Sequence, residues 1–289
     1  DLYIVRRVTM GNPQSGIMFT QSMFFKLLVS FLLVIFILST FHGVAYNISI
    51  KNLEEEIVFN ANERLYNIAS KADKELMQLE NMLLKMSQES FFSYISKGKA
   101  ASPYTQRLIV DTYNLYRTNP GYNVSCIHTV FILTAEPRDT IMTFESTYYT
   151  KTFFELFYSN PIYNESFWRE EINDNFIIKY YPIDTCQYVY KNDILLPLMP
   201  VAVKASNNYN YIMVALIDIQ SLLYSIDEYF ADDFCIVDMN NTVLYSSMDG
   251  NLIEDFVKHR DIGYIKDDSG YLFIQKSPYN NLLYCKRLS

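Results

Sequence analysis

The sequence predicts an α+β fold in which a transmembrane helix continues into a long helix that packs along two antiparallel-sheet modules. The first observation is an uncharged apolar stretch near the N-terminus. The second is a helical apolar stripe that follows it directly. The third is a run of short β-rich segments, separated by turn motifs, in the rest of the chain. A chain of 289 residues is long enough for an anchor and one or two domains.

The apolar stretch from Leu27 to Tyr46 covers 20 residues and holds no Asp, Glu, Lys or Arg. As a helix it would reach about 30 Å, the thickness of the hydrocarbon core of a bilayer. We therefore expect a transmembrane helix over residues 23–46, after an unstructured cytoplasmic tail at 1–22. The alternative is a cleaved signal peptide, because Gly43-Val44-Ala45 resembles a cleavage site. The apolar run is long for such a peptide.

The charges that flank this stretch differ between its two sides. They are Arg6, Arg7 and Lys26 before it, and Lys51, Glu54, Glu55 and Glu56 after it. Lysine and arginine favour the cytoplasmic side of a membrane. We therefore expect a protein of the cell membrane that crosses the bilayer once in this sequence, with its N-terminus inside the cell and residues 47–289 outside. The net charge of −8 argues against nucleic-acid binding by this segment.

A helical apolar stripe follows the span and is predicted to form a long membrane-emergent helix over residues 47–97. Its members recur in steps of three or four residues and are Ile50, Leu53, Ile57, Ala61, Leu65, Ile68, Ala72, Leu76, Leu79, Leu83 and Met86. The mean step is about 3.6 residues, the period of a straight helix and not the 3.5 of a coiled-coil seam. This period favours a helix laid along two stacked sheet domains over a sustained coiled coil.

Helical and strand-type patterns alternate after Gly98. Helices are predicted at 104–117, 149–158, 164–172, 220–229 and 251–258, and strands at 124–134, 140–144, 176–181, 195–204, 211–217, 233–237, 242–246, 270–276 and 282–286. Between two of these strands, Asp238-Met239-Asn240-Asn241 is a strong hairpin signal. The order predicts a mixed α/β unit, a connecting helix and a smaller β-rich unit.

This order resembles that of double Cache sensors, in which a long helix runs along two PAS-like modules. The resemblance is carried by LLPLMPVAVKASNNYNYIMVALIDIQSLLYSI at 195–226 and by the hairpin FCIVDMNNTVLYSS at 234–247. It implies a distal PAS-like (Cache) module at 98–226. It also implies a proximal PAS-like module at 227–289 that ends short of its full length.

The N-terminal segment FFKLLVSFLLVIFIL at 24–38, with the long helix after it, resembles the start of membrane-bound AraC-type transcription regulators of Gram-positive bacteria. Sensor histidine kinases of the same bacteria begin almost alike. In both groups a second transmembrane helix and a cytoplasmic output module follow the sensor, and we expect both to lie outside this sequence. The resemblance implies a signal-sensing region that binds a small ligand and transmits through the membrane helix to that output, above all AraC-type transcription control.

Other function classes stay open beside this one. The chain could be the sensor region of a histidine kinase or chemoreceptor, or a membrane-anchored structural or adhesive protein without a small ligand. An enzyme is not expected. His42, His128 and His259 lack metal-ligand spacing, and the eight glycines are too sparse for a phosphate-binding loop. We therefore predict no catalytic residue, metal or cofactor.

Amino-acid-binding members of the Cache family use an Arg, a Trp two residues later, an adjacent Tyr, a later Tyr and the Asp of an Asp-Ile step. Trp168 matches the Trp, Tyr181 the later Tyr and Asp218 the Asp. Ser166 occupies the Arg position and Arg169 the adjacent Tyr position, so the carboxylate clamp is absent from its expected place. The resemblance still implies ligand contacts from Trp168, Arg169, Tyr181 and Asp218.

The implied pocket lies between the distal sheet and the 149–172 helices. Its ligand would be a sugar, an amine, an amino acid or a protein, and the other expected partners are the lipid bilayer and a second copy in a homodimer. A purely structural alternative places Trp168 in the core, Arg169 in solvent and Asp218 at a helix N-terminus. The 25 Tyr and 20 Phe are predicted to pack half-buried strands, with a sugar- or ring-binding cleft as the alternative.

The four cysteines form no CxxC motif. Cys126, Cys235 and Cys285 each lie in an apolar, strand-like run, which predicts buried free thiols. Outside the cell the four could instead form disulfides, in one of three connectivities.

Overall fold

The computed structural model describes residues 23–89, 103–119, 124–134, 140–189, 194–204, 211–227, 232–248, 263–267, 270–279 and 281–288. The chain forms two compact units, Asp1–Asn60 and Ala61–Ser289. Helix α2, Met23–Ser87, begins in the first unit and ends in the second.

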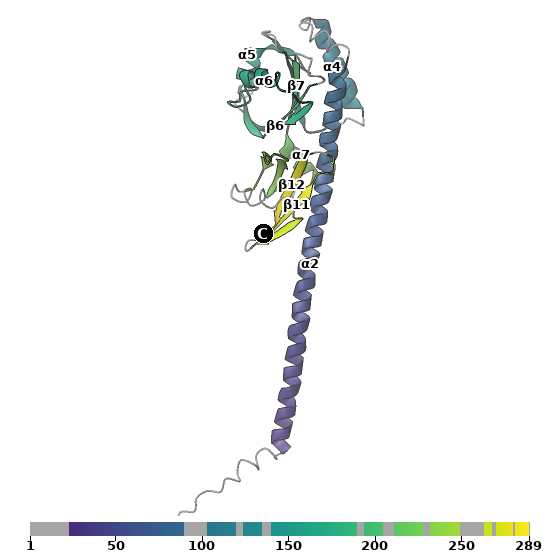
Figure 1. The fold of residues 1–289 in the computed structure, drawn as a ribbon, viewed down its shortest axis with the longest axis vertical. Coiled ribbons are helices and arrows are strands. Elements are labelled where there is room, and N and C mark those ends of the chain that lie inside the picture. The colour runs from purple at the N-terminus through teal and green to yellow at the C-terminus, as the bar shows by residue number, and fades with distance from the viewer. Residues whose placement is uncertain are drawn as a thin grey trace, which may run out of the picture. The chain divides into compact units, whose positions relative to one another are not determined.

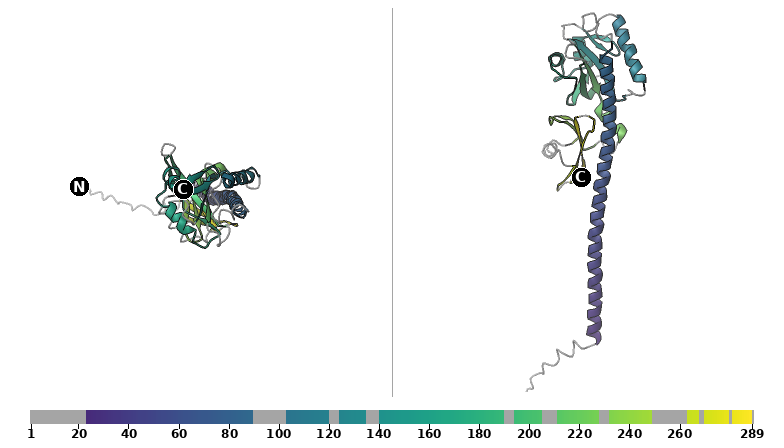
Figure 2. Two further views of the ribbon diagram at one scale, coloured as in Figure 1. Left: turned by 90° about the horizontal axis from the view of Figure 1, so that it is seen from above. Right: turned by 45° about the vertical axis from the view of Figure 1, so that its right-hand side comes forward.

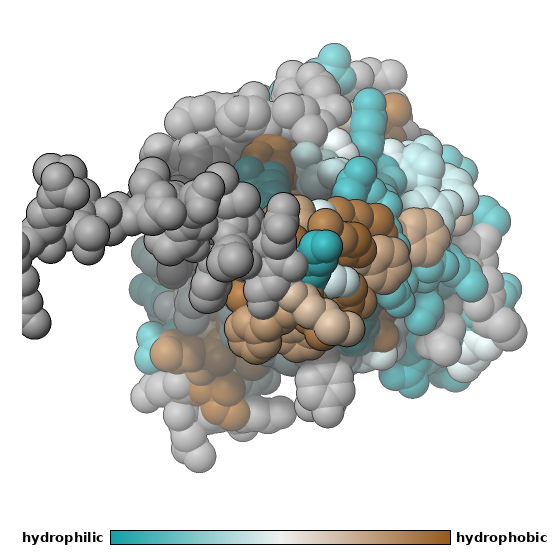
Figure 3. Space-filling view, turned by 90° about the horizontal axis from the view of Figure 1, so that it is seen from below, coloured by the Kyte–Doolittle hydropathy of each residue, from teal (hydrophilic) through white to brown (hydrophobic). Residues whose placement is uncertain are grey.

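In the first unit, α2 carries apolar side chains on all sides. None of its most apolar stretch is buried in protein, and large side chains such as Phe31 and Phe36 are exposed. Figure 3 looks along this helix and shows hydrophobic side chains gathered at its end. A helix that is apolar all round and uncovered by protein is suited to lipid. The structure thus confirms the predicted helix and makes it a candidate membrane span.

The apolar stripe of α2 is buried only from Ala61 onward. Ile50, Leu53 and Ile57, the first three positions of the predicted stripe, are exposed in the first unit. All later positions of the stripe are buried, from Ala61 to Met86. The apolar stripe predicted that another part of the protein packs along the helix. Such packing is observed for the part of α2 that follows Ala61.

A seven-stranded antiparallel sheet forms the larger part of the second unit. Its strands are β1 (Ile127–Thr134), β2 (Thr140–Thr143), β3 (Thr147–Tyr149), β4 (Ile178–Tyr180), β5 (Asp184–Tyr188), β6 (Ile194–Val203) and β7 (Tyr211–Ile217). The order is β3-β2-β1-β7-β6-β4, and β5 pairs with β6. Every residue of β7 is buried, as expected for a central strand covered on both faces.

Helices cover the two faces of this sheet, as Figure 1 shows. On one side lie α2 and α4 (Pro103–Thr118). On the other lie α5 (Thr150–Thr152), the one-turn π-helix η2 (Phe153–Phe157) and α6 (Glu165–Glu171). The predicted helices at 104–117, 149–158 and 164–172 are thereby confirmed. Strands β3 and β5 were not predicted, because they are short and lack regular alternation.

A second, five-stranded antiparallel sheet follows helix α7 (Ile219–Ile226). Its strands are β8 (Phe234–Asp238), β9 (Val243–Ser246), β10 (Tyr264–Asp267), β11 (Gly270–Lys276) and β12 (Leu282–Leu288), in the order β10-β11-β12-β8-β9. The predicted hairpin at Asp238 joins β8 to β9. The predicted helix at 251–258 lies outside the described residues.

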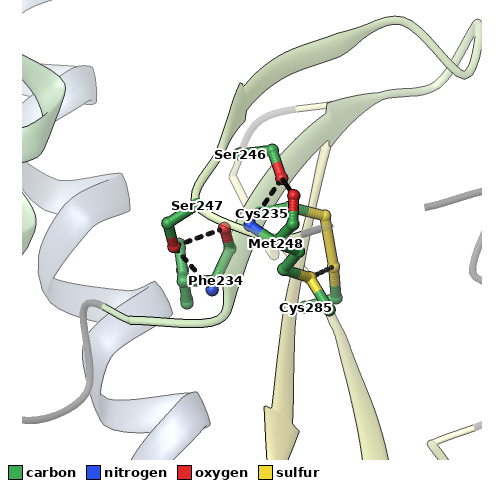
Figure 4. The surroundings of a disulfide bond; sticks show 6 residues. All are labelled: Phe234, Cys235, Ser246, Ser247, Met248 and Cys285. Atoms are coloured by element: carbon green, nitrogen blue, oxygen red, sulfur yellow. Dashed lines mark hydrogen bonds between the residues drawn. A yellow bond between two sulfur atoms is a disulfide. The ribbon is translucent and has the colours of Figure 1, made fainter. Parts of the chain in front are cut away.

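Cys235 and Cys285 form a disulfide between β8 and β12 (Figure 4). The two strands are antiparallel neighbours with these residues directly opposite, and their Cα atoms lie 5.2 Å apart. The prediction of free thiols at these two positions was therefore wrong. The apolar sequence of each strand predicts that its cysteine is buried, but it does not show which residue of the neighbouring strand lies opposite that cysteine. Cys126 is free and buried, as predicted, and so is Cys186.

Helix α2 makes polar contacts with both sheets. The Tyr180 hydroxyl at the end of β4 donates to Glu80, and the Tyr284 hydroxyl on β12 donates to Asp73, each at 2.5 Å. Figures 1 and 2 show both sheets alongside the part of α2 that belongs to the second unit. The predicted fold, a long helix packed along two antiparallel-sheet modules, is thus observed.

Candidate ligand-binding site

A cavity of about 240 Å³ lies against the seven-stranded sheet on the side of η2. Its described walls come from β1, the β2–β3 segment, η2, β5 and β6. They are His128, Thr129, Thr143, Glu145, Tyr148, Phe153, Phe157, Tyr158, Cys186, Tyr188, Ile194, Leu196 and Leu198. Most are aromatic or aliphatic and a few are polar, which is the usual composition of a small-molecule site.

Two local irregularities shape this cavity. In β1 the register against β7 slips between Ile127 and Thr129, so His128 is an extra residue in a β-bulge. Bulges bend a strand and redirect its side chains, and they are common beside functional sites. The second irregularity is η2, where the Tyr158 N–H donates to the Phe153 carbonyl at 2.7 Å. Single π-turns of this kind are also frequent at functional sites.

A connected series of aromatic rings forms one wall of the cavity. The Tyr148 and Phe157 ring centroids are 4.6 Å apart, and those of Phe157 and Tyr188 are 5.8 Å apart. Phe153 and Tyr158 continue the series at 6.0 Å. These rings present several π-faces and edges to the same space.

The Tyr158 hydroxyl is the most unusual polar group at this site. The side chain is 2% exposed, and its oxygen, which lies beside the Cys186 thiol, has no partner at hydrogen-bond distance and angle within the described part of the chain. Burial raises the pKa of Tyr158 well above its ordinary value, with a contribution from nearby Cys186. A buried hydroxyl without a partner costs about 1–3 kcal/mol, so its presence beside a cavity suggests that a ligand can satisfy it.

Two further polar groups differ in character. Burial raises the pKa of the Cys186 thiol to about 11, so this thiol is protonated and unreactive at neutral pH. Glu145 is exposed and follows Thr143, whose hydroxyl accepts from the N–H groups of Glu145 and Ser146. These hydrogen bonds stabilise the turn between β2 and β3 and so restrict the position of the Glu145 backbone, from which its carboxylate extends. Lysine and arginine are absent from the described lining residues.

Trp168 and Tyr181, both predicted site residues, lie together, with Trp168 in the core and Tyr181 on the wall of a cleft of about 880 Å³. Trp168 is fully buried, and its indole N–H donates to the Tyr163 carbonyl at 3.1 Å. The Trp168 and Tyr181 ring centroids are 5.1 Å apart. The Tyr181 hydroxyl donates to Glu171 at 2.6 Å. Neither residue lines the 240 Å³ cavity, although Phe131 contacts both Trp168 and the cavity residue Phe153.

Arg169 and Asp218, the other two predicted residues, have local partners. The Arg169 guanidinium lies 2.6 Å from the Glu165 carboxylate, one helical turn earlier, and donates to the Thr134 carbonyl. Asp218 is the N-cap of α7 and accepts from the Ser221 N–H at 2.9 Å. The structure therefore places the four predicted residues in three different environments, and their contact with a ligand stays a prediction.

A second, larger cleft of about 880 Å³ lies between the two sheets. Its carboxylates are already engaged by protein groups. Glu171 pairs with Lys179 at 2.8 Å, and Asp238 accepts from the Thr242 N–H at 2.7 Å. Because Glu171 and Asp238 already have partners within the protein, the larger cleft offers a ligand fewer unpaired polar groups. The smaller cavity, with its unpartnered Tyr158 hydroxyl, is therefore the better candidate site.

Comparison with known proteins supports the fold. No family model matches the chain, and no curated protein matches it. Among solved structures, the extracellular domain of the putative histidine kinase soHK1S-Z6 is similar, with 11% identity over 82% of this chain and 95% of that one and a TM-score of 0.53. At this identity the likeness concerns the fold alone.

Two chemoreceptor domains are similar at lower scores. One is the ligand-binding domain of Campylobacter jejuni Tlp3 in complex with L-norvaline, at 10% identity, covering 81% of this chain and 91% of that one with a TM-score of 0.49. The other is that of the Pseudomonas aeruginosa amino acid chemoreceptor PctC in complex with GABA, at 10% identity, covering 82% of this chain and all of that one with a TM-score of 0.43.

Proposed function

We propose that this chain is the extracytoplasmic signal-sensing region of a membrane-anchored regulator and binds a small organic molecule in the 240 Å³ cavity. The observation that carries the proposal is the buried Tyr158 hydroxyl, which lines that cavity and has no partner among the described residues. The fold shared with a histidine kinase extracellular domain is consistent with a sensor.

In this proposal residues 23–46 cross the membrane and 47–289 lie outside the cell, with 1–22 as the cytoplasmic tail. The basic residues before the span and the acidic run after it support this orientation. Residues 98–226 act as the distal, ligand-binding module and 227–289 as the proximal one. The chain acts without catalysis, as part of a homodimer.

The signal would pass through α2. This helix bonds to the seven-stranded sheet through Glu80 and to the five-stranded sheet through Asp73. A ligand that favours one arrangement of these contacts would bias the helix, since coupling requires differential contacts in two states. The output we favour is AraC-type control of transcription, for which the resemblance of residues 24–38 is the support. A histidine kinase output is the second candidate, favoured by the soHK1S-Z6 likeness, and a chemoreceptor output is a further alternative.

The test is a thermal-shift screen of the full chain in lipid nanodiscs against amines, sugars, amino acids and short peptides. We expect at least one class to raise the melting temperature, because a ligand that binds only the folded state stabilises it. The Thr129→Trp substitution should abolish that shift by filling the cavity from β1. Thr185→Trp, on an exposed strand position that does not line the cavity, is the matched control.

Two outcomes would count against the proposal. If a ligand stabilises the Thr129→Trp variant as well as the parent, the site lies elsewhere, and the region beside Trp168 and Tyr181 is the next candidate. If no compound shifts the parent chain, a protein partner or a structural, adhesive role becomes the better account.

A further inference from the structure

We propose that the 240 Å³ cavity selects organic ammonium cations. This inference rests on the proposed function and names the ligand class of the same site. It follows from the charges at the cavity, the arrangement of its aromatic rings and the buried Tyr158 hydroxyl, which lacks a partner among the described residues.

The charges at the cavity disfavour an anionic ligand. A carboxylate or phosphate is normally held by arginine, lysine, protonated histidine or several N–H groups, and the described lining has His128 but neither lysine nor arginine. Glu145 is instead the lining carboxylate, and it has no ion pair or side-chain hydrogen bond among the described residues. The chain as a whole carries a net charge of −8, which also favours the approach of cations.

The aromatic wall is suited to hold a cation. The Tyr148, Phe157 and Tyr188 rings lie 4.6 and 5.8 Å apart in series, and all three line the same cavity. A cation within about 6 Å of a ring centroid is attracted by the quadrupole of the ring, and several rings together recognise ammonium groups. Here the Glu145 carboxylate would add a full negative charge at the rim.

The Tyr158 hydroxyl then has a function. Because the phenol is buried and protonated, its oxygen can accept a hydrogen bond from an N–H group of the ligand. The cavity also limits size. Its 240 Å³ compares with the roughly 150 Å³ of a cavity that holds benzene. A ligand with one ring or a short branched chain and one ammonium group would fit.

The test uses matched probes that differ only in charge. Benzylamine, benzyl alcohol and benzoate share one ring, and choline is compared with its carbon analogue, in which a tert-butyl group replaces trimethylammonium. Binding to the full chain in nanodiscs is measured by titration calorimetry at neutral pH. We expect each cation to bind at least about tenfold more tightly than its neutral analogue, and benzoate to bind most weakly.

Substitutions test which side chains cause the preference for the cation. Glu145→Gln should reduce the preference for the cation to about threefold or less while leaving the melting temperature of the free chain unchanged. Glu155→Gln removes an exposed carboxylate of η2 that does not line the cavity, and it should change nothing. Phe157→Leu should weaken both cations while affecting benzyl alcohol less.

The results separate this inference from the function on which it rests. Equal binding of amine and alcohol, both abolished by Thr129→Trp, would overturn the ammonium assignment and leave the cavity as the sensor site. Tighter binding of benzoate would overturn it in the same way. If none of the probes binds, the ammonium assignment is wrong, and the broader thermal-shift screen decides the proposed function independently.

Discussion

The Tyr284 hydroxyl donates a hydrogen bond of 2.5 Å to the Asp73 carboxylate, which also accepts one of 2.7 Å from the Ser277 hydroxyl. Asp73 belongs to α2, while Ser277 and Tyr284 belong to the β11–β12 hairpin. All three side chains are buried. A buried carboxylate is costly unless it is hydrogen-bonded, so these contacts specify how the helix meets the five-stranded sheet.

Replacement of Asp73 should therefore distinguish its hydrogen bonds from its charge. Asp73→Ala removes the acceptor for the buried Tyr284 and Ser277 hydroxyl protons and should lower the free energy of unfolding by about 2–4 kcal/mol. Asp73→Asn keeps a polar partner for both and should stay within about 1 kcal/mol of the parent. Thermal unfolding of the full chain in nanodiscs gives both values. Asp111→Ala, at an exposed position on α4, is the control, and an equal effect of both alanine variants would contradict the prediction.

The same carboxylate should make stability depend on pH. Burial raises the pKa of Asp73 and of Glu80 above their ordinary values of 3.8 and 4.5. Between the ordinary and the raised pKa the folded chain binds more protons than the unfolded chain, so the contribution of these groups to stability increases as pH falls and is lost as pH rises through the raised pKa.

We expect Asp73→Asn to lessen this dependence. The melting temperatures of parent and variant, measured from neutral pH down to the ordinary pKa of 3.8, should differ in slope, with the parent gaining more on acidification. Parallel curves would show that Asp73 does not titrate in this window.

Thiol labelling will test the cysteine assignments. In the denatured but unreduced chain, Cys126 and Cys186 should react with a maleimide, while Cys235 and Cys285 should react only after reduction. A loop of 50 residues closed by a disulfide corresponds to about 4 kcal/mol in the chain-entropy model. Cys235→Ser with Cys285→Ser should therefore lower stability by about 2–4 kcal/mol. Labelling of all four thiols without reduction would refute the pairing.

The membrane orientation predicts the behaviour of reporter fusions. Alkaline phosphatase fused after residue 100 should be active, because the residues after the span are expected outside the cytoplasm. Replacing Arg6, Arg7 and Lys26 with glutamate should reduce that activity by removing the positive flank. Strong activity of a cytoplasm-only reporter at the same position would reverse the assignment.

The sequence was sufficient for features that depend on local pattern. The apolar stretch predicted the candidate span, and the 3.6-residue stripe predicted the buried positions of α2 from Ala61 to Met86. Strand β7 was predicted with its observed ends, Tyr211 and Ile217, because a continuous apolar run marks a central strand. The exposure of Ile50 was not predictable, since periodicity shows a face but not how far a partner extends along it.

The candidate site depended on contacts between distant segments. Tyr158 and Glu145 gave no signal in the sequence, because the cavity arises where the β-bulge at His128 meets η2. Likewise, the Cys235–Cys285 pairing required the register of β8 on β12. The abundance of Tyr and Phe was the one available hint of an aromatic wall, but it could not be told from ordinary strand packing.

The disulfide also has a mechanical consequence. A pulling force applied to the chain before Cys235 and after Cys285 would pass through the S–S bond and bypass the 50-residue segment between them. At up to about 3.5 Å per residue, this removes on the order of 175 Å from the length to which the oxidised chain can be stretched. Reduction would release that length, so single-molecule extension should show a longer final step under reducing conditions.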